Sequence, residues 1–198
     1  MVQTAMAPLR MPAAARKKQL LDIALQVFAR DGYHETSMNA LAAEAGVTKP
    51  VLYQHFASKH LLVDEILDGL GNDLLEAISS SVSKANTSRE RVQLGFQAIF
   101  RFFDEEPSAF AVFFGQKLGA DPQFHNAGEK IELKITETIA RIIDTNIPND
   151  ALTMASGVNG LAKGMVTFWM STGRVDSPDK MAELATNLVW EGLENLTY

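Results

Sequence analysis

Apolar residues recur along this chain at intervals of three and four, the spacing that places side chains on one face of a helix. In the segment RKKQLLDIALQVFARDG these positions are Leu20, Ile23, Ala24, Val27 and Phe28. The same period continues to a last helix expected at about Pro178 to Leu196, and no strand-type alternation appears. The pattern predicts an all-α fold of about nine helices.

Two short predicted helices, Ser37 to Ala45 and Thr48 to Phe56, are separated only by Gly46 and Val47. Two short helices joined by a tight glycine turn form a helix-turn-helix. Pro50 fits the start of the second helix, since the first four N–H groups of a helix have no internal partner. We expect Thr48 to be its N-cap.

The apolar residues of this unit are expected to pack against the preceding helix, and they are Leu41, Ala45, Val47, Leu52 and Phe56. Polar side chains of the second helix then remain at the surface. A lysine and a glutamine on an exposed helix suit the major groove, because lysine donates to guanine and glutamine pairs with adenine.

This region resembles the DNA-binding region of the tetracycline-repressor (TetR) family over about 45 residues. The matching residues are Ala24, Phe28, Gly32, Tyr33, Thr36, Ser37, Leu41, Ala42, Ala45, Gly46, Val47, Thr48, Leu52, Tyr53, His55, Phe56, Lys59 and Leu62. The Ala- and Pro-rich start of the sequence predicts a flexible tail at 1–15. The resemblance implies a helix-turn-helix DNA-binding domain at 16–60 and an effector-binding and dimerisation domain at 61–198.

The resemblance also implies which residues contact double-stranded DNA. A hydroxyl at Thr36 or Ser37 would hold a phosphate, and Tyr53, His55 and Lys59 would touch the sugar-phosphate backbone. The positions facing base edges or nearby phosphates would be Thr48, Lys49, Pro50, Val51 and Gln54. For Arg16, Lys17 and Lys18, phosphate contact and simple solvation both stay open.

Proteins of this kind bind a palindromic operator as homodimers, with recognition helices about 34–36 Å apart. Small residues at Gly157, Gly160 and Gly164 would permit close helix contact between subunits, or equally packing within one chain. In the final helix, Leu184, Leu188 and Trp190 supply apolar surface. The resemblance favours an interface built from these two helices and their mates.

The middle of the chain is rich in aromatic residues, which are typical both of ordinary core and of small-molecule pockets. The resemblance implies a small effector bound among these helices, and we expect it to be apolar or aromatic. The candidate lining residues are Phe100, Phe103, Phe110, Phe114, Met165, Phe168 and Trp169.

The composition narrows the function classes. The chain has no cysteine, which excludes disulfides, thiolate nucleophiles and iron–sulfur clusters. No apolar run approaches the roughly 18 residues of a membrane span, so we expect a cytoplasmic protein without membrane contact. The net charge is −6, yet residues 1–60 hold seven basic and four acidic side chains, as a basic module on an acidic body would.

Enzymatic activity is the competing interpretation, and the motifs argue against it. The acidic run Asp104-Glu105-Glu106 stands at a helix end before Pro107, where solvated charge is ordinary. His55 and His60 are five residues apart and do not form an i, i+4 metal pair. We expect a repressor released by its effector, with no metal or cofactor; a DNA-binding regulator without a small ligand stays open as the alternative.

Overall fold

The computed structural model describes residues 11–115, 124–143 and 148–191, and the chain is helical throughout these ranges apart from short connections. The helices are α1 (Ala13–Asp31), α2 (Met38–Glu44), α3 (Lys49–His55), α4 (Lys59–Val82), α5 (Ser88–Glu105), α6 (Pro107–Phe114), α7 (His125–Ile142), α8 (Pro148–Ser171) and α9 (Pro178–Glu191). The prediction of an all-α fold is confirmed. The expected tail falls mostly outside the described residues, and so does the expected end of the last helix at Leu196.

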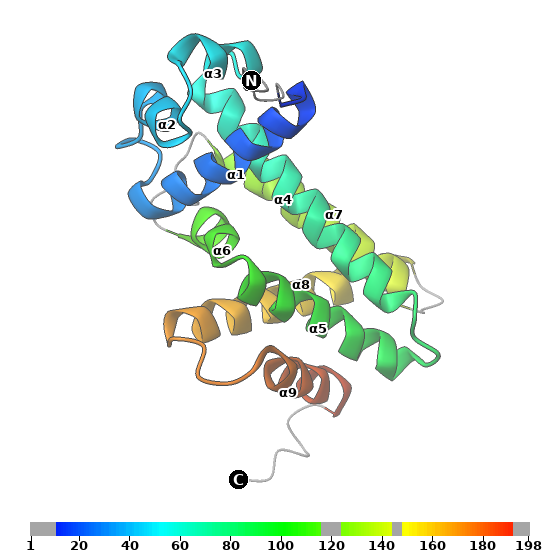
Figure 1. The fold of residues 1–198 in the computed structure, drawn as a ribbon. Coiled ribbons are helices and arrows are strands. Elements are labelled where there is room, and N and C mark those ends of the chain that lie inside the picture. Colours follow the sequence, from blue (N-terminus) through cyan, green and yellow to red (C-terminus); the bar gives the residue numbers. More distant parts are fainter. Residues whose placement is uncertain (1–10, 116–123, 144–147, 192–198) are drawn as a thin grey trace, which may run out of the picture.

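The first three helices form a compact group at one end of the molecule (Figure 1). The long helix α4 leads from this group into the body, where α7 runs beside it and α5, α8 and α9 lie further along. The helices α1–α3 and the start of α4 therefore form one unit, for which the sequence predicts DNA binding and which we call the DNA-binding unit, and the remaining helices make the body.

The small core of the first unit comes from the residues that the helical period assigned to it. Leu41, Ala45, Leu52 and Phe56 are buried against α1, and Val47 is half-buried on the same cluster. Because an apolar side chain gains roughly 1.5–3 kcal/mol when it is fully buried, this set holds two helices that are too short to be stable alone.

The turn between α2 and α3 depends on Gly46, whose φ is 63°. That left-handed conformation is costly for a residue with a Cβ atom, so glycine suits the position. Thr48 is the N-cap of α3 and Pro50 lies in its first turn, as expected.

Helix α4 belongs to both parts of the molecule. Leu62, Val63 and Ile66 are buried near its start, while Leu74 and Ile78 are buried in the body. The domain boundary expected at residue 61 therefore falls inside one uninterrupted helix of 24 residues.

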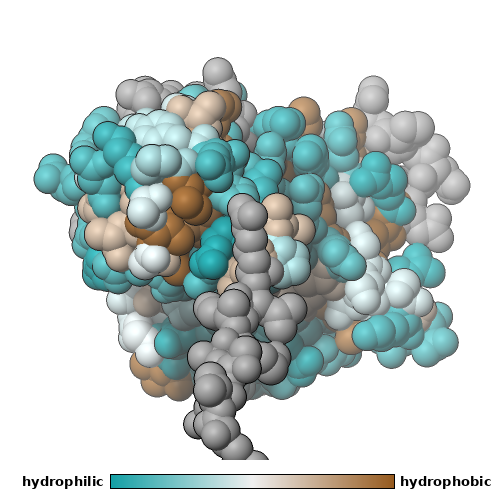
Figure 2. Space-filling model, turned by 45° about the horizontal axis from the view of Figure 1, so that its top comes forward, coloured by the Kyte–Doolittle hydropathy of each residue, from teal (hydrophilic) through white to brown (hydrophobic). Residues whose placement is uncertain are grey.

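The space-filling view in Figure 2 turns the end that carries α1–α3 toward the reader. Its surface is mainly hydrophilic, with a smaller hydrophobic area between the polar side chains. Within the described ranges, no helix combines the length and the apolar character needed to cross a membrane.

Candidate functional site

An open cleft of about 690 Å³ lies in the body at the C-terminal end of α4. Aliphatic and aromatic side chains make up most of its wall, including Ile78, Val82, Val92, Phe96, Ile99, Ile139, Ile142, Met154, Leu161, Val189 and Trp190. The cleft falls within the roughly 300–1,000 Å³ usual for small-molecule sites. Its composition suits an apolar molecule.

Arg91 is the charged residue on the wall of this cleft. It is half-buried, and it forms no ion pair with any residue that the structure describes. A guanidinium presents paired donors to a carboxylate or phosphate. The cleft therefore combines an apolar body with one group that can hold an anion.

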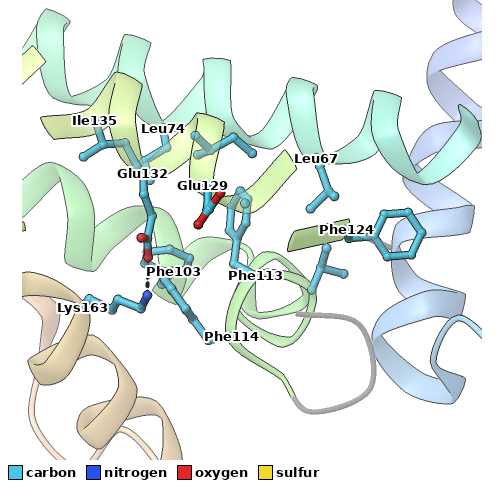
Figure 3. Close-up of a pocket in the computed structure, with 13 residues that line it drawn as sticks. Leu67, Leu74, Phe103, Phe113, Phe114, Phe124, Glu129, Glu132, Ile135 and Lys163 are labelled. Carbon is cyan, nitrogen blue, oxygen red and sulfur yellow. Dashed lines mark hydrogen bonds and ion pairs between the residues drawn. The ribbon is translucent and has the colours of Figure 1, made fainter. Parts of the chain in front are cut away.

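A second, smaller cavity of about 180 Å³ lies nearer to the DNA-binding unit (Figure 3). Phe103, Phe114 and Phe124 line it, and Glu132 and Lys163 form an ion pair at its edge. The Lys163 ammonium also lies 5.7 Å from the centroid of the Phe114 ring. This inner cavity is thus aromatic, and it also carries the charged side chains of Glu129, Glu132 and Lys163.

The seven aromatic and methionine residues expected to line a pocket divide into two groups. Phe103 and Phe114 line the inner cavity. The other five line neither this cavity nor the cleft, and they are Phe100, Phe110, Met165, Phe168 and Trp169.

The reasons for this correction differ from residue to residue. Phe100 is fully buried and packs edge-on to Trp169, with ring centroids 5.6 Å apart. The Trp169 indole N–H donates to the Asp176 carbonyl at 2.9 Å, which fixes that ring in the core. Phe168 is 68% exposed on the outer face of α8, while Phe110 and Met165 pack against core residues.

Arg91 and Phe124 were missed by the sequence analysis. Arg91 directly precedes Val92, the first apolar residue of the α5 pattern, and both residues line the cleft. Phe124 directly precedes α7, and no helical period identifies it.

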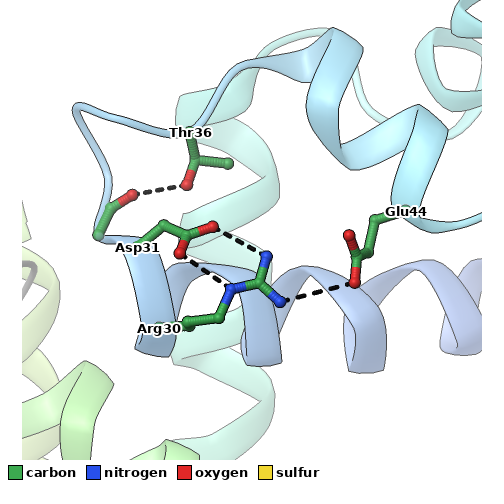
Figure 4. Close-up of polar contacts among 5 residues, drawn as sticks. Arg30, Asp31, Thr36 and Glu44 are labelled. Atoms are coloured by element: carbon green, nitrogen blue, oxygen red, sulfur yellow. Dashed lines mark hydrogen bonds and ion pairs between the residues drawn. The ribbon is translucent and has the colours of Figure 1, made fainter.

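In the DNA-binding unit, Thr36 does not have the role expected for it. Its side chain is buried, and its hydroxyl donates to the Gly32 carbonyl at 2.7 Å (Figure 4). A buried hydroxyl cannot reach a phosphate. Ser37 is exposed instead, and its oxygen accepts the Ala40 N–H at 3.1 Å, which caps α2 and leaves the hydroxyl proton for donation.

Arg30 joins the ends of α1 and α2 in the same region. Its Nε and Nη2 donate to the Asp31 carboxylate at 2.9 Å each, and its Nη1 lies 3.6 Å from Glu44 (Figure 4). The hydrogen bonding of its guanidinium to the Asp31 carboxylate is the main reason that the pKa of Arg30 is raised. This cation is therefore held by carboxylates, and it helps to orient α2 on α1.

Lys59 also has a structural role that the sequence did not indicate. Its ammonium donates to the carbonyls of Tyr33 and Thr36 at 2.7 Å each and lies 4.1 Å from the Tyr33 ring centroid. These contacts tie the start of α4 to the turn between α1 and α2. Lys59 therefore helps to position the unit, and its contact with the sugar-phosphate backbone stays a prediction.

The outer face of α3 carries the remaining candidates for DNA contact. Thr48, Lys49, Pro50, Tyr53 and Gln54 are exposed, and Val51 and His55 are half-buried beside them. The Lys49 ammonium lies 5.8 Å from the Tyr53 ring centroid, so the two side chains stand on the same surface. Lysine, glutamine and tyrosine on one exposed helix can contact both base edges and phosphates.

Of the three basic residues in the first turns of α1, Lys17 is the most constrained. It forms an ion pair with Glu65 of α4 and lies 5.7 Å from the centroid of the Phe56 ring. Lys18 lies 3.8 Å from Asp22, and Arg16 donates to Gln19 at 2.7 Å. All three contacts lie within the protein, which favours the solvated and structural interpretation of these residues.

The glycines of α8 stand on its outer face. Gly157, Gly160 and Gly164 are exposed, and a Cβ atom built on any of them would meet nothing within 4 Å. On α9, Leu184 is 40% exposed and Leu188 is half-buried. Gly157 and Trp190, expected at a dimer interface, also border the cleft.

Within the part of the chain that the structure covers, no group of three His, Asp or Glu side chains is arranged to hold a metal ion.

Comparison with known proteins agrees with this geometry. Residues 20–66 match the family model described as bacterial regulatory proteins of the tetR family. Over 190 residues the chain is 27% identical to the HTH-type transcriptional activator FasR of Mycolicibacterium smegmatis, covering 94% of this chain and 87% of that one. Over 100 residues it is 34% identical to the HTH-type transcriptional repressor KstR2 of Rhodococcus jostii, covering 50% and 49%.

Solved structures show the same fold. A TetR-like transcriptional regulator from Rhodococcus superposes with a TM-score of 0.76 and 25% identity, covering 94% of this chain and all of that one. FadR of Bacillus subtilis, solved in complex with stearoyl-CoA, gives a TM-score of 0.77 at 17% identity, covering 89% and 98%. These relatives are named as regulators of transcription rather than as enzymes. Residues 20–66 thus match the tetR family, and the relatives and solved structures support a TetR-family transcriptional regulator.

Proposed function

We propose that this protein is a dimeric repressor that binds a palindromic operator and is released by an elongated apolar effector. The observation that carries the proposal is the exposed outer face of α3, where Lys49, Tyr53 and Gln54 stand on a rigid three-helix frame. Ser37 and His55 add phosphate contacts at its edges. The protein acts on DNA in the cytoplasm.

Dimerisation uses the outer faces of α8 and α9. Open space above Gly157, Gly160 and Gly164 lets a second helix approach closely, and the neighbouring Phe168 and Leu184 leave apolar surface for it to cover. A two-fold dimer brings two α3 helices to one face of the DNA, about 34–36 Å apart, which matches successive major grooves.

The effector occupies the 690 Å³ cleft, with its apolar chain along α4 and α5 and an anionic group at Arg91. A fatty acyl chain ending in a carboxylate or a nucleotide thioester has this chemistry. The stearoyl-CoA bound by the Bacillus subtilis neighbour supports the choice of ligand class.

Effector binding reaches the DNA-binding unit through α4. Ile78 and Val82 line the cleft, while Leu62 and Val63 belong to the core beneath α3. A shift of this helix at one end moves the other, because a helix of 24 residues is about 36 Å of stiff rod. The effector changes operator affinity only by its differential affinity for the two arrangements.

Activation is the second candidate for the direction of control. It is favoured by the name of FasR, an activator that matches this chain over most of its length. The two candidates share the DNA contacts and differ in where the operator lies relative to the promoter.

Genome-wide mapping of bound DNA, followed by deletion of the gene, tests the proposal. A repressor binds over promoters whose transcripts rise on deletion, and an activator binds upstream of promoters whose transcripts fall. Purified protein should lose affinity for the mapped operator when an acyl ligand is added. Binding without any preferred palindrome would contradict the proposal as a whole.

A further inference from the structure

Between the cleft and the inner cavity lies a third, smaller space of about 40 Å³, which shares lining residues with both and which we call the waist. Along α4 the lining residues pass in order from one space to the next. Leu67 and Leu74 line the inner cavity, Leu74 and Ile78 line the waist, and Ile78 and Val82 line the cleft.

Helix α5 gives the same order from the opposite side. Phe103 lines the inner cavity and the waist, Ile99 lines the waist and the cleft, and Phe96 lines the cleft. Two helices thus follow one apolar tract through the body. From Leu67 to Val82 the rise of α4 is about 22 Å.

Arg91 is the charged residue on the cleft, Glu129 of α7 lines the inner cavity, and a further pair of charges lines the waist. Glu132 of α7 and Lys163 of α8 form this ion pair, which lines both the waist and the inner cavity, and the close-up shows the pair beside Phe103 and Phe114 (Figure 3). Their side chains are 47% and 49% exposed, so both groups keep part of their hydration. Neither residue lines the cleft.

An apolar chain that extends from the cleft through the waist must pass this pair and displace the water on it. Removing water from charged groups without new hydrogen bonds costs far more than one additional methylene gains. The chain offers the pair no hydrogen bond in return, because hydrocarbon neither accepts nor donates one.

We infer that the Glu132–Lys163 pair determines the length of the effector, by confining the apolar chain to the cleft and excluding it from the inner cavity. This inference rests on the proposed function, since it assigns the specificity of the same site. Two residues that lie outside the cleft thus set the longest acyl chain that the cleft can bind.

Isothermal titration of the full-length protein with octanoate, decanoate, laurate, myristate, palmitate and stearate tests the inference. For the wild type, affinity should rise by roughly tenfold for each two carbons while the chain fills the cleft. It should then stop rising at a cut-off. A parallel series of the coenzyme A thioesters distinguishes a free carboxylate from a thioester as the group at Arg91.

The decisive variant is Lys163→Met with Glu132→Met, which replaces the pair with unbranched apolar side chains of similar length. The cut-off should move to longer chains, with at least tenfold tighter binding of the longest ligands and little change for the shortest. The exchanged variant, Lys163→Glu with Glu132→Lys, keeps an ion pair and should keep the wild-type cut-off.

Lys130→Met with Asp68→Asn is the matched control. It removes another ion pair, 3.7 Å long, that joins α7 to α4 without lining the tract, and it should leave the length profile unchanged.

Three results would overturn the inference. One is a cut-off that stays in place in the Met variant while that variant binds short chains normally. Another is an equal loss of affinity for every chain length, which would make Lys163 the partner of the ligand's anionic group. The third is a wild type that binds no member of either series, and this result alone would also overturn the proposed effector class.

Discussion

The rings of Phe124 and Tyr33 meet edge to face, with 4.8 Å between their centroids and 77° between their planes. Phe124 also stacks on His60 at 5.2 Å and lines the inner cavity of the body. Tyr33 lies in the turn that Lys59 ties to α4. One buried phenyl ring therefore connects the body with the turn that sets the position of α2.

Replacing this ring should weaken the connection. Phe124→Leu should lower the free energy of unfolding by about 1.5 kcal/mol, because leucine fills most of the volume but not the ring contacts. Operator affinity without effector should also change, while effector affinity at the distant cleft should not. Thermal unfolding, gel-shift assays and calorimetry measure the three quantities. Phe102→Leu, a half-buried ring outside this contact, is the control; equal effects on operator binding by both variants would contradict the assignment.

Substitutions on the outer face of α3 should distinguish residues that contact base edges from residues that contact phosphates. Gln54→Ala and Lys49→Ala should reduce discrimination between the operator and a sequence changed at one base pair by about 1–3 kcal/mol. Tyr53→Ala should weaken binding to both sequences alike. Fluorescence anisotropy with the two duplexes measures this, with Lys130→Ala on the body as a control for the lost charge. Unchanged binding by all three α3 variants would rule out α3 as the recognition helix.

Gly46 should be sensitive to substitution in a way that an ordinary helical glycine is not. Gly46→Ala forces a Cβ atom into a left-handed backbone and should destabilise the protein by about 1–2 kcal/mol. Gly69→Ala, on the exposed face of α4 with open space around it, should instead stabilise it by roughly 0.5–1 kcal/mol. Denaturant unfolding measures both, and effects of the same sign would show that the turn does not need this conformation.

A large side chain on the open face of α8 should leave the folding of one subunit intact but should block the packing of two subunits. Gly160→Leu meets no atom of its own subunit within 4 Å of the new Cβ, so the folded monomer should persist. If α8 forms the dimer interface, sedimentation should show a monomer with much weaker operator binding. Gly69→Leu provides the control on α4. A Gly160→Leu protein that remains dimeric would exclude this face from the interface.

The helical period and the helix-turn-helix spacing were sufficient to predict the all-α fold and the small core around Leu52 and Phe56. They worked because those side chains are buried by helices that are neighbours in sequence. Thr36 was misplaced because a hydroxyl at a helix start serves equally well as an internal donor, and only the conformation of the preceding turn decides between the two roles.

The cavities were harder to predict because contacts between distant segments form them. Phe100 and Phe103 are three residues apart on α5 and both are buried, yet Phe100 packs against Trp169 and Phe103 lines the inner cavity. The period of a single helix cannot distinguish these outcomes, since both rings lie on its apolar side. The cleft itself depends on α4, α5, α7, α8 and α9 meeting at one place.

The uninterrupted course of α4 limits how this protein can be divided. Leu62, Val63 and Ile66 complete the core beneath α2 and α3, and the Lys17–Glu65 ion pair closes its side. A fragment that ends at residue 60 would lack these three apolar side chains, and Phe56 and Leu52 would be exposed to water. An excised operator-binding module, or a chimera that joins it to a different sensor, must therefore carry at least the first two turns of α4. In such a fusion, the angular register of that helix at the junction sets how the new sensor faces the DNA.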